Sequence, residues 1–291
     1  MTQLAIEIVQ LSKVFKGKKR AMVEALQCLD LSIAHGEIVG FLGPNGAGKS
    51  TTIKILTGQI WPTSGTIRLN GRPVTAFRAR ETVGYLPENP SFYRFLTARE
   101  YLRFVGQIFK MPSKYRENEI DRILDLLGLV EAADRPLKGF SKGMTQRLGL
   151  AQTLLHDPAL YILDEPMSGL DPVGRALIKD ILRSLKQRGK TVFFSTHIIS
   201  DVEALCDRAA IIVHGRLAAI ADVHNDFMQA SAYLLQVRNA QGVRESLIVP
   251  ADQVSATVQR FLGQGATLEQ LEPQEKNLEN VFLHTVETKG R

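Results

Sequence analysis

The nine residues Gly43-Pro44-Asn45-Gly46-Ala47-Gly48-Lys49-Ser50-Thr51 determine how the rest of the sequence is interpreted. They match the phosphate-binding loop, in which a glycine, any four residues and Gly-Lys-Ser follow one another. Glycine lets backbone N–H groups approach phosphate oxygens, and the helix that follows presents its positive N-terminus to the same anion. We expect Lys49 to contact the β- and γ-phosphates of a nucleotide and the Ser50 hydroxyl to bind magnesium.

The sequence on both sides of this loop gives it the context that such a site requires. An apolar strand is expected over 37–42 and a helix over 52–56. Further strands are expected over 4–15, 25–33, 65–70, 161–163 and 191–194, and helices over 97–130, from Ser141 onward and between Asp171 and Gly189. Strands that alternate with helices imply a largely parallel sheet with right-handed crossovers, and hence an α/β fold.

Two adjacent carboxylates follow the apolar strand that ends at Leu163. By itself, such a pair is most simply explained as the solvent-exposed end of a strand. In a chain that also carries a phosphate-binding loop, it indicates the second half of a site that hydrolyses a nucleoside triphosphate. Asp164 is expected to hold magnesium through water, and Glu165 to orient or deprotonate the attacking water. Neighbouring side chains on a strand point to opposite faces, so the two carboxylates should take different roles.

The segment Phe140-Ser141-Lys142-Gly143-Met144 opens a helix, for which Ser141 alone would be an ordinary N-cap. Between the phosphate-binding loop and Asp164, however, it resembles the Leu-Ser-Gly-Gly-Gln signature of the ATP-binding cassette (ABC) ATPases. Ser141 and Gly143 match this signature, whereas Lys142 and Met144 depart from it. The resemblance covers roughly residues 4–221. It implies a P-loop NTPase of ABC type, with a parallel core sheet, an antiparallel β subdomain and a helical signature subdomain over about 89–157.

Further positions acquire a role from the same resemblance. The segment from Ser168 to Asp171 corresponds to the D-loop of the family, and His197 to the switch histidine that contacts the γ-phosphate. Phe15 resembles the aromatic residue that stacks on adenine, although a lone phenylalanine at a strand end is most often a core residue. Glu88 occupies the place of the Q-loop glutamine, where it offers a carboxylate to magnesium or water.

The sequence after residue 221 forms a separate pattern. A polar stretch over 222–231 is expected to be a linker. A small α+β domain over 232–291 is predicted from strands over 233–237, 244–249 and 266–271 and helices over 251–263 and 277–287. The segment 277–283 resembles the C-terminal end of ATPase subunits that serve small bacterial exporter permeases. This domain is expected to regulate or stabilise a dimer, and the alternative is a contribution to stability alone.

The composition limits the function classes. A net charge of +6 favours a polyanionic partner or an anionic membrane surface only slightly, and no nucleic acid is expected as a partner. The two cysteines are too few for a four-cysteine zinc site. The most apolar stretches, such as 38–42 and 209–213, are far shorter than the roughly 18 residues that cross a bilayer, so no transmembrane segment is expected.

The resemblance implies an ATP hydrolase that uses ATP and Mg²⁺ to power an ABC transporter, in the direction of export, from the cytoplasmic face of the inner (plasma) membrane. The implied partners are integral membrane permease subunits and a second, identical ATPase subunit. Ser141 and Gly143 of one copy would then act on the ATP held by the other. The alternative is a soluble ABC ATPase that serves as a cofactor-assembly scaffold. A P-loop kinase would leave the signature and His197 unexplained.

Three aromatic residues, Phe92, Tyr93 and Phe95, follow shortly after Glu88. They either pack inward beneath the helical subdomain or form part of an apolar groove that receives a short cytoplasmic helix of the permease. The sequence leaves both possibilities open.

Overall fold

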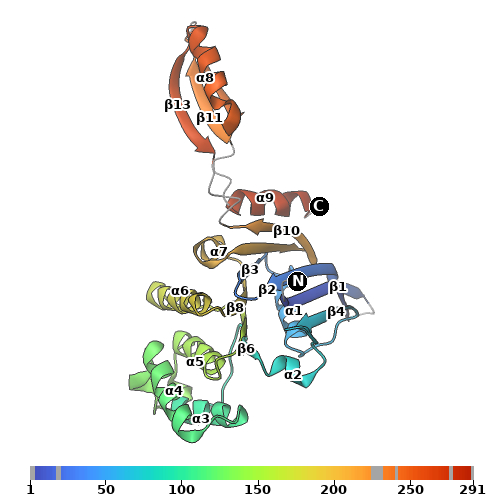
Figure 1. Cartoon of the computed structure of the whole chain (residues 1–291), viewed down its shortest axis with the longest axis vertical. Coiled ribbons are helices and arrows are strands. Elements are labelled where there is room, and N and C mark those ends of the chain that lie inside the picture. Colours follow the sequence, from blue (N-terminus) through green and yellow to red (C-terminus); the bar gives the residue numbers. More distant parts are fainter. Residues whose placement is uncertain (1–3, 18–20, 224–231, 240–241, 275–277, 290–291) are drawn as a thin grey trace. The chain divides into compact units, whose positions relative to one another are not determined.

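The computed structural model describes residues 4–17, 21–223, 232–239, 242–274 and 278–289 (Figure 1). The chain divides into two compact units, Met1–Ile220 and Ala221–Arg291, and each is described by itself. Most of the predicted linker, residues 224–231, lies outside the described residues. Among the described residues, no helix combines the length and the apolar character that a bilayer crossing requires.

A six-stranded sheet forms the centre of the first unit, with the strand order β10-β9-β3-β8-β7-β6. The strands are β10 (Arg216–Asp222), β9 (Arg208–Val213), β3 (Ile38–Leu42), β8 (Thr191–Thr196), β7 (Leu160–Asp164) and β6 (Val83–Leu86). From β9 to β6 all neighbours are parallel, as the alternating pattern predicts. The carboxyl ends of β3, β7 and β8 therefore meet at one edge, where ligands usually bind.

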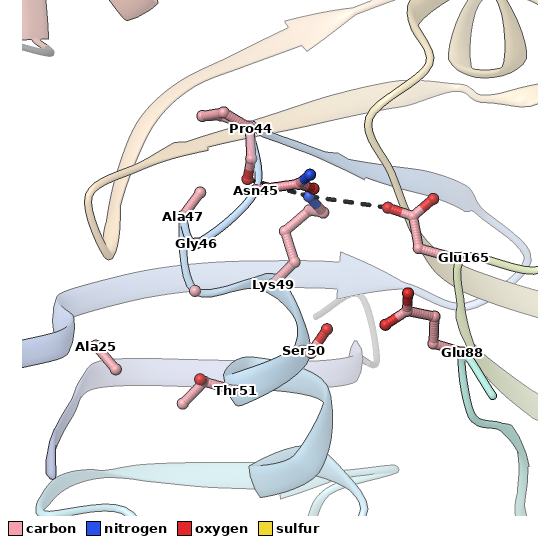
Figure 2. Close-up of a pocket in the computed structure, with 11 residues that line it drawn as sticks. Ala25, Pro44, Asn45, Gly46, Ala47, Lys49, Ser50, Thr51, Glu88 and Glu165 are labelled. Carbon is pink, nitrogen blue, oxygen red and sulfur yellow. Dashed lines mark hydrogen bonds and ion pairs between the residues drawn. The ribbon is translucent and has the colours of Figure 1, made fainter. Parts of the chain in front are cut away.

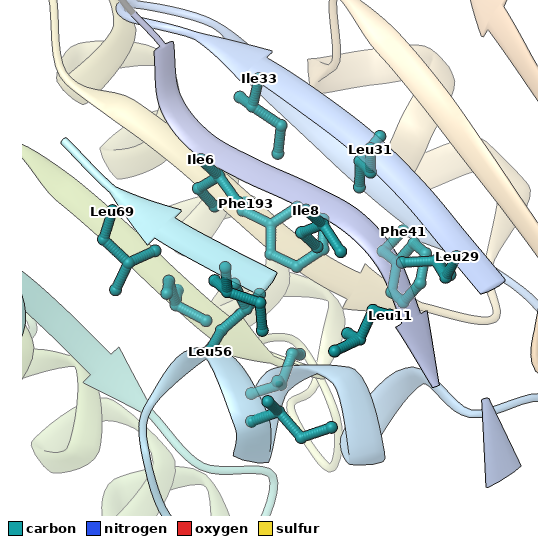
Figure 3. Close-up of a cluster of buried hydrophobic side chains, with 14 of the residues drawn as sticks. Ile6, Ile8, Leu11, Leu29, Leu31, Ile33, Phe41, Leu56, Leu69 and Phe193 are labelled. Carbon is teal, nitrogen blue, oxygen red and sulfur yellow. The ribbon is translucent and has the colours of Figure 1, made fainter. Parts of the chain in front are cut away.

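A second, antiparallel sheet has the order β2-β1-β4-β5. Its strands are β1 (Leu4–Lys16), β2 (Met22–Ala34), β4 (Ser64–Leu69) and β5 (Arg72–Pro73). Asn70 and Gly71, both with positive φ, form the turn after β4. A buried apolar cluster joins this sheet to the parallel sheet and to α1 (Lys49–Leu56) (Figure 3). Burial of this cluster fixes the phosphate-binding loop, because the loop connects β3 of one layer to α1.

Three helices form the predicted helical subdomain: α3 (Ala98–Ile108), α4 (Ser113–Leu126) and α5 (Lys142–Leu154) (Figure 1). The single helical region predicted over 97–130 is wrong in one respect, because the chain leaves the helix between Phe109 and Pro112. Lys110 has a φ of +54°, and the proline lacks the N–H that a helix interior needs. Ile120, Ile123 and Leu124 form an apolar stripe on α4 and are buried.

The remaining helices of the first unit are α2 (Phe77–Arg80), α6 (Pro172–Gln187) and α7 (Ile199–Leu205), with short 3-10 helices at Val130–Ala132 and Leu137–Gly139. Asp171 caps α6, accepting a hydrogen bond from the backbone N–H of Gly174 at 2.7 Å. Ser141 likewise caps α5 through the N–H of Met144 at 3.2 Å.

The second unit contains a three-stranded antiparallel sheet with the order β12-β11-β13. Its elements are β11 (Ala232–Arg238), β12 (Arg244–Pro250), a 3-10 helix (Ala251–Gln253), α8 (Val254–Gly263), β13 (Thr267–Gln274) and α9 (Leu278–Lys289). This order of strands and helices is the one that the sequence pattern predicts. The core consists of buried Leu235, Val237 and Val249 on the sheet, against which Val258 and Phe261 of α8 pack.

Candidate nucleotide-binding site

Residues 44–51 of the phosphate-binding loop line an open cavity of about 400 Å³ (Figure 2). Ala25, Glu88 and Glu165 complete its walls. Gly48, which directly precedes α1, has a φ of +111°, and a Cβ added there would lie 2.7 Å from the carbonyl oxygen of Ala25. Only glycine fits this position, because both the backbone angle and the close approach exclude a side chain. The cavity has the size of an ordinary small-ligand site.

Lys49 extends along this loop, and only 6% of its surface is exposed to solvent. Its ammonium group donates hydrogen bonds to the carbonyl oxygens of Gly43 at 2.6 Å and Pro44 at 3.2 Å, and it lies 3.8 Å from the Glu165 carboxylate. Burial lowers the pKa of Lys49, and the carboxylates of Glu165, Asp164 and Glu88 oppose this shift. The cation is therefore held close to several acidic groups at the loop that the motif assigns to phosphate.

Asp164 ends β7 and is only 3% exposed. One of its carboxylate oxygens accepts a hydrogen bond from the Ser195 hydroxyl at 2.6 Å, and the Ser50 hydroxyl lies 3.4 Å from the same oxygen. Ser195 also accepts a hydrogen bond from the backbone N–H of Glu165 at 2.9 Å. The sequence reasoning missed Ser195. Its signal is a hydroxyl residue at the end of an apolar strand, but only the pairing of β7 with β8 shows what it contacts.

Glu165 adopts a φ of +47°, which is unusual for a residue with a side chain. Backbone strain of this kind accumulates at functional sites. The carboxylate lies 3.1 Å from Nδ1 of His197, which follows β8, and on its other side it faces Lys49. The two adjacent carboxylates thus contact different groups, since Asp164 approaches Ser50 and Glu165 approaches Lys49 and His197.

Glu88, from the loop after β6, lines the same cavity, and Figure 2 shows its carboxylate on the side of Ser50 and Glu165. Phe15 lies on β1 and is 39% exposed. The centroid of its ring is 4.9 Å from the Lys13 ammonium nitrogen. Phe15 is not among the described residues that line the cavity. The structure therefore brings Glu88 to the phosphate-binding loop and leaves Phe15 on the exposed part of the antiparallel sheet.

The signature-like segment lies at the N-terminus of α5 and does not line this cavity in the described part of the chain. It packs instead against the D-loop: the Lys142 side chain lies so close to Gly169 that a Cβ there would be 2.6 Å from its Cε. Gln146 of α5 is buried and donates hydrogen bonds to the carbonyl oxygens of Glu165 at 3.3 Å and Pro166 at 3.2 Å. Sequence reasoning missed Gln146, whose signal is a polar residue on the buried face of a helix.

The aromatic residues after Glu88 do not all pack inward. Phe92 is half-buried and meets the Tyr101 ring edge-on, with centroids 4.7 Å apart. Tyr93 is 60% exposed and Phe95 is 75% exposed, and their ring centroids are 5.8 Å apart. Two large rings thus lie side by side on the surface of the first unit.

Comparison with known proteins agrees with the geometry of the nucleotide-binding site. The ABC transporter family matches residues 26–168. The chain is 45% identical over 216 residues to an uncharacterized ABC transporter ATP-binding protein of Synechocystis sp., covering 73% of this chain and 61% of that protein. It is 41% identical to the bacitracin transport ATP-binding protein BcrA of Bacillus licheniformis, covering 73% of this chain and 68% of BcrA.

The chain is also 42% identical to the Nod factor export ATP-binding protein I of Sinorhizobium fredii, covering 74% of this chain and 62% of that protein. Among solved structures, the ATP-binding subunit of an ABC transporter aligns with a TM-score of 0.69 and 31% identity, over 75% of this chain and 90% of that one. The expected P-loop fold of ABC type is thereby confirmed, and the chain belongs to the family of ABC transporter ATP-binding proteins.

Proposed function

We propose that this protein binds and hydrolyses ATP to power an ABC transporter that works in export. The observation that carries the proposal is the convergence of the phosphate-binding loop with Asp164, Glu165 and His197 at one sheet edge, although these residues are far apart in the sequence. The relatives named for bacitracin transport and Nod factor export support the transporter over the cofactor-assembly scaffold.

In this proposal the loop 43–51 holds the phosphates of ATP through its backbone N–H groups and the N-terminus of α1, with Lys49 at the β- and γ-phosphates. Phe15 stacks on the adenine. Ser50, Asp164 and Glu88 supply hydroxyl and carboxylate oxygens, which are the ligands that Mg²⁺ prefers, so the donor set fits this ion. Bound Mg²⁺ would neutralise charge on the β- and γ-phosphate oxygens.

Glu165 is the general base in this proposal, because it is a carboxylate beside the phosphate-binding loop and Asp164 is already bound to Ser195. It takes the proton of the water that attacks the γ-phosphate. His197, at 3.1 Å from this carboxylate, keeps it oriented and contacts the γ-phosphate. Gln146 holds the backbone at Glu165 and Pro166 by its hydrogen bonds to their carbonyl oxygens.

Two identical copies are proposed to share each site, because Ser141 to Met144 do not line the cavity of their own chain. In a head-to-tail dimer, Ser141 and Gly143 of one copy would offer the α5 N-terminus to the γ-phosphate held by the other. ATP then favours the closed dimer, and hydrolysis releases it. The D-loop, from Ser168 to Asp171, lies against the signature-like segment and would move with it.

The transport path is proposed to belong to permease subunits, with this protein peripheral at the cytoplasmic face of the inner membrane. Exposed Tyr93 and Phe95 offer an apolar surface for a short permease helix. Residues 1–221 would be the ATPase domain, with its helical subdomain over about 89–157, followed by a linker over 222–231. The domain 232–291 is proposed to regulate or stabilise the dimer.

The test is the rate of ATP hydrolysis by the purified chain as a function of its concentration. A shared site predicts that the rate rises more than linearly at low protein concentration. Strict proportionality from a species shown to be monomeric would contradict the shared site. Co-purification with an integral membrane protein, weakened by Tyr93→Ala without loss of ATP binding, would distinguish a transporter subunit from an assembly scaffold.

A further inference from the structure

A cluster of buried and partly buried charges joins the helix after the D-loop to the helix after His197. The Asp201 side chain is only 1% exposed and accepts hydrogen bonds from the Arg175 guanidinium at 2.9 and 3.0 Å. The Lys179 ammonium lies 2.9 Å from the same carboxylate. Arg175 and Lys179 are one turn apart on α6, so both reach one acceptor. A carboxylate so far removed from water requires partners of this kind.

Asp201 lies in the first turn of α7, four residues after His197, which precedes the helix. Between the two residues, the backbone N–H of Ile198 donates to the Thr196 hydroxyl at 3.0 Å, and that of Asp201 to the Ile198 carbonyl oxygen at 3.3 Å. The segment is thus attached to β8 at one end and to α6 at the other. The His197 side chain is itself 52% exposed, so packing alone does not fix its ring and the position of its backbone becomes important.

The space beside this cluster would allow the ring to move. A second cavity, of about 210 Å³, is lined by Glu165, His197, Arg175 and Asp201, among other residues. If the start of α7 were released from α6, the His197 ring would have room to turn into this space and lose its contact with Glu165. The ion cluster is therefore placed where it can determine whether the histidine and the carboxylate stay together.

We infer that Asp201 is a positioning residue that, through Arg175 and Lys179, holds His197 against Glu165 and ties this pair to the D-loop helix. The expected effect on hydrolysis rests on the proposed function, whereas the position of the His197 ring does not depend on it. Because α6 begins at the D-loop residue Asp171, a displacement of the D-loop would reach His197 through the same ion pairs.

The principal experiment is Asp201→Asn in the full chain, which keeps the shape of the side chain and removes its charge. We expect kcat for ATP hydrolysis to fall about tenfold, as misplacement of a reacting group predicts, while KM for ATP changes less than about twofold. Asp180→Asn is the matched control, since Asp180 lies on α6 but is exposed and pairs only with Arg183 among the described contacts. In a His197→Ala background, Asp201→Asn should have almost no further effect on single-turnover hydrolysis.

A second measurement is independent of hydrolysis. The chain has six histidines, so the imidazole signal of His197 can be assigned in a ¹H–¹³C NMR spectrum by comparison with His197→Gln. Asp201→Asn should shift this signal in the protein without nucleotide, and Asp180→Asn should not. If Asp201→Asn does not fold, Lys179→Gln replaces it, because Asp201 then keeps Arg175 and a smaller shift is expected.

An unchanged His197 signal, an unchanged kcat, or an undiminished effect of Asp201→Asn in the His197→Ala background would each overturn the inference. A wild-type protein whose hydrolysis does not depend on Lys49 would instead contradict the proposed function. In that case the NMR comparison still decides whether Asp201 positions His197.

Discussion

The two units of this chain place their charged groups in opposite ways. In the first unit, Lys49, Asp164 and Asp201 are almost completely buried, and they lie at or beside the carboxyl edge of the parallel sheet. In the second unit, the charged contacts lie at the surface of the sheet, where Glu269 pairs with Arg238 at 2.6 Å and with Arg244 at 2.7 Å. The buried side chains of its sheet core are apolar in the part that the structure describes.

This difference indicates which unit carries the chemistry. Burying a charge costs free energy, which is compensated only by specific partners, so a protein keeps such groups where chemistry needs them. Exposed ion pairs contribute little, and a small apolar core is sufficient to fold a sheet and a helix. We therefore expect substitutions of the buried charges of the first unit to change activity, and substitutions of exposed charges in either unit to change little.

Lys49→Ala should give the largest effect, a loss of ATP hydrolysis of at least about 10²-fold, because it removes the cation that faces the phosphates. Burial lowers the pKa of Lys49, which means that its charge does not stabilise the fold. Removal of this charge should therefore not lower the thermal unfolding temperature. Lys54→Ala is the control, because Lys54 lies on the same helix with an exposed side chain. Hydrolysis by Lys49→Ala at the wild-type rate would remove the phosphate-binding loop from the site.

Glu165→Gln should lower hydrolysis by about 10²–10⁴-fold while ATP still binds, because only the group that activates water is lost. ATP should then hold this variant as a dimer, which size-exclusion chromatography with and without ATP will show. The matched control is the same substitution in the other unit, Glu269→Gln, which should leave hydrolysis unchanged. Normal turnover of Glu165→Gln would mean that another residue is the base.

Leu235→Ala should destabilise the second unit by about 2–5 kcal/mol, the usual cost of removing a large buried side chain. Leu235 is 1% exposed at the centre of that small core. ATP binding, measured by titration, should stay intact, because the phosphate-binding loop belongs to the other unit. Ile248→Ala, at an exposed position of β12, should have little effect. A loss of nucleotide binding in folded Leu235→Ala would show that the two units are not independent.

Glu88→Gln should have the smallest effect within the site. The amide keeps an oxygen that can face magnesium or water, and it restores the residue that the family more often has. We expect hydrolysis to stay within about threefold of the wild-type rate, less than the cost of a lost charged hydrogen bond. A loss comparable to that of Lys49→Ala would give the Glu88 carboxylate an essential role beside Asp164 and Glu165.

In the first unit, the sequence pattern gave no indication of β6, β10 or α7. The phosphate-binding loop, the Asp164–Glu165 pair, the Ser141 cap and the order of the elements in the second unit were predicted from the sequence alone. These predicted features depend on local spacing along the chain, which fixes dihedral angles, caps and the alternation of strands and helices. The same local reasoning failed between residues 109 and 112, where the periodic pattern gave no indication of the break despite Pro112.

The contacts between distant polar groups depend on how the elements pack. Ser195 reaches Asp164 because β8 pairs with β7 in one register, and Gln146 reaches the Glu165 carbonyl because α5 packs beside that strand end. Arg175 and Asp201 form no motif, and each occurs in a sequence that would suit an exposed helix. Their contact exists because α6 and α7 pack side by side, and no spacing along the chain can specify a partner across such an interface.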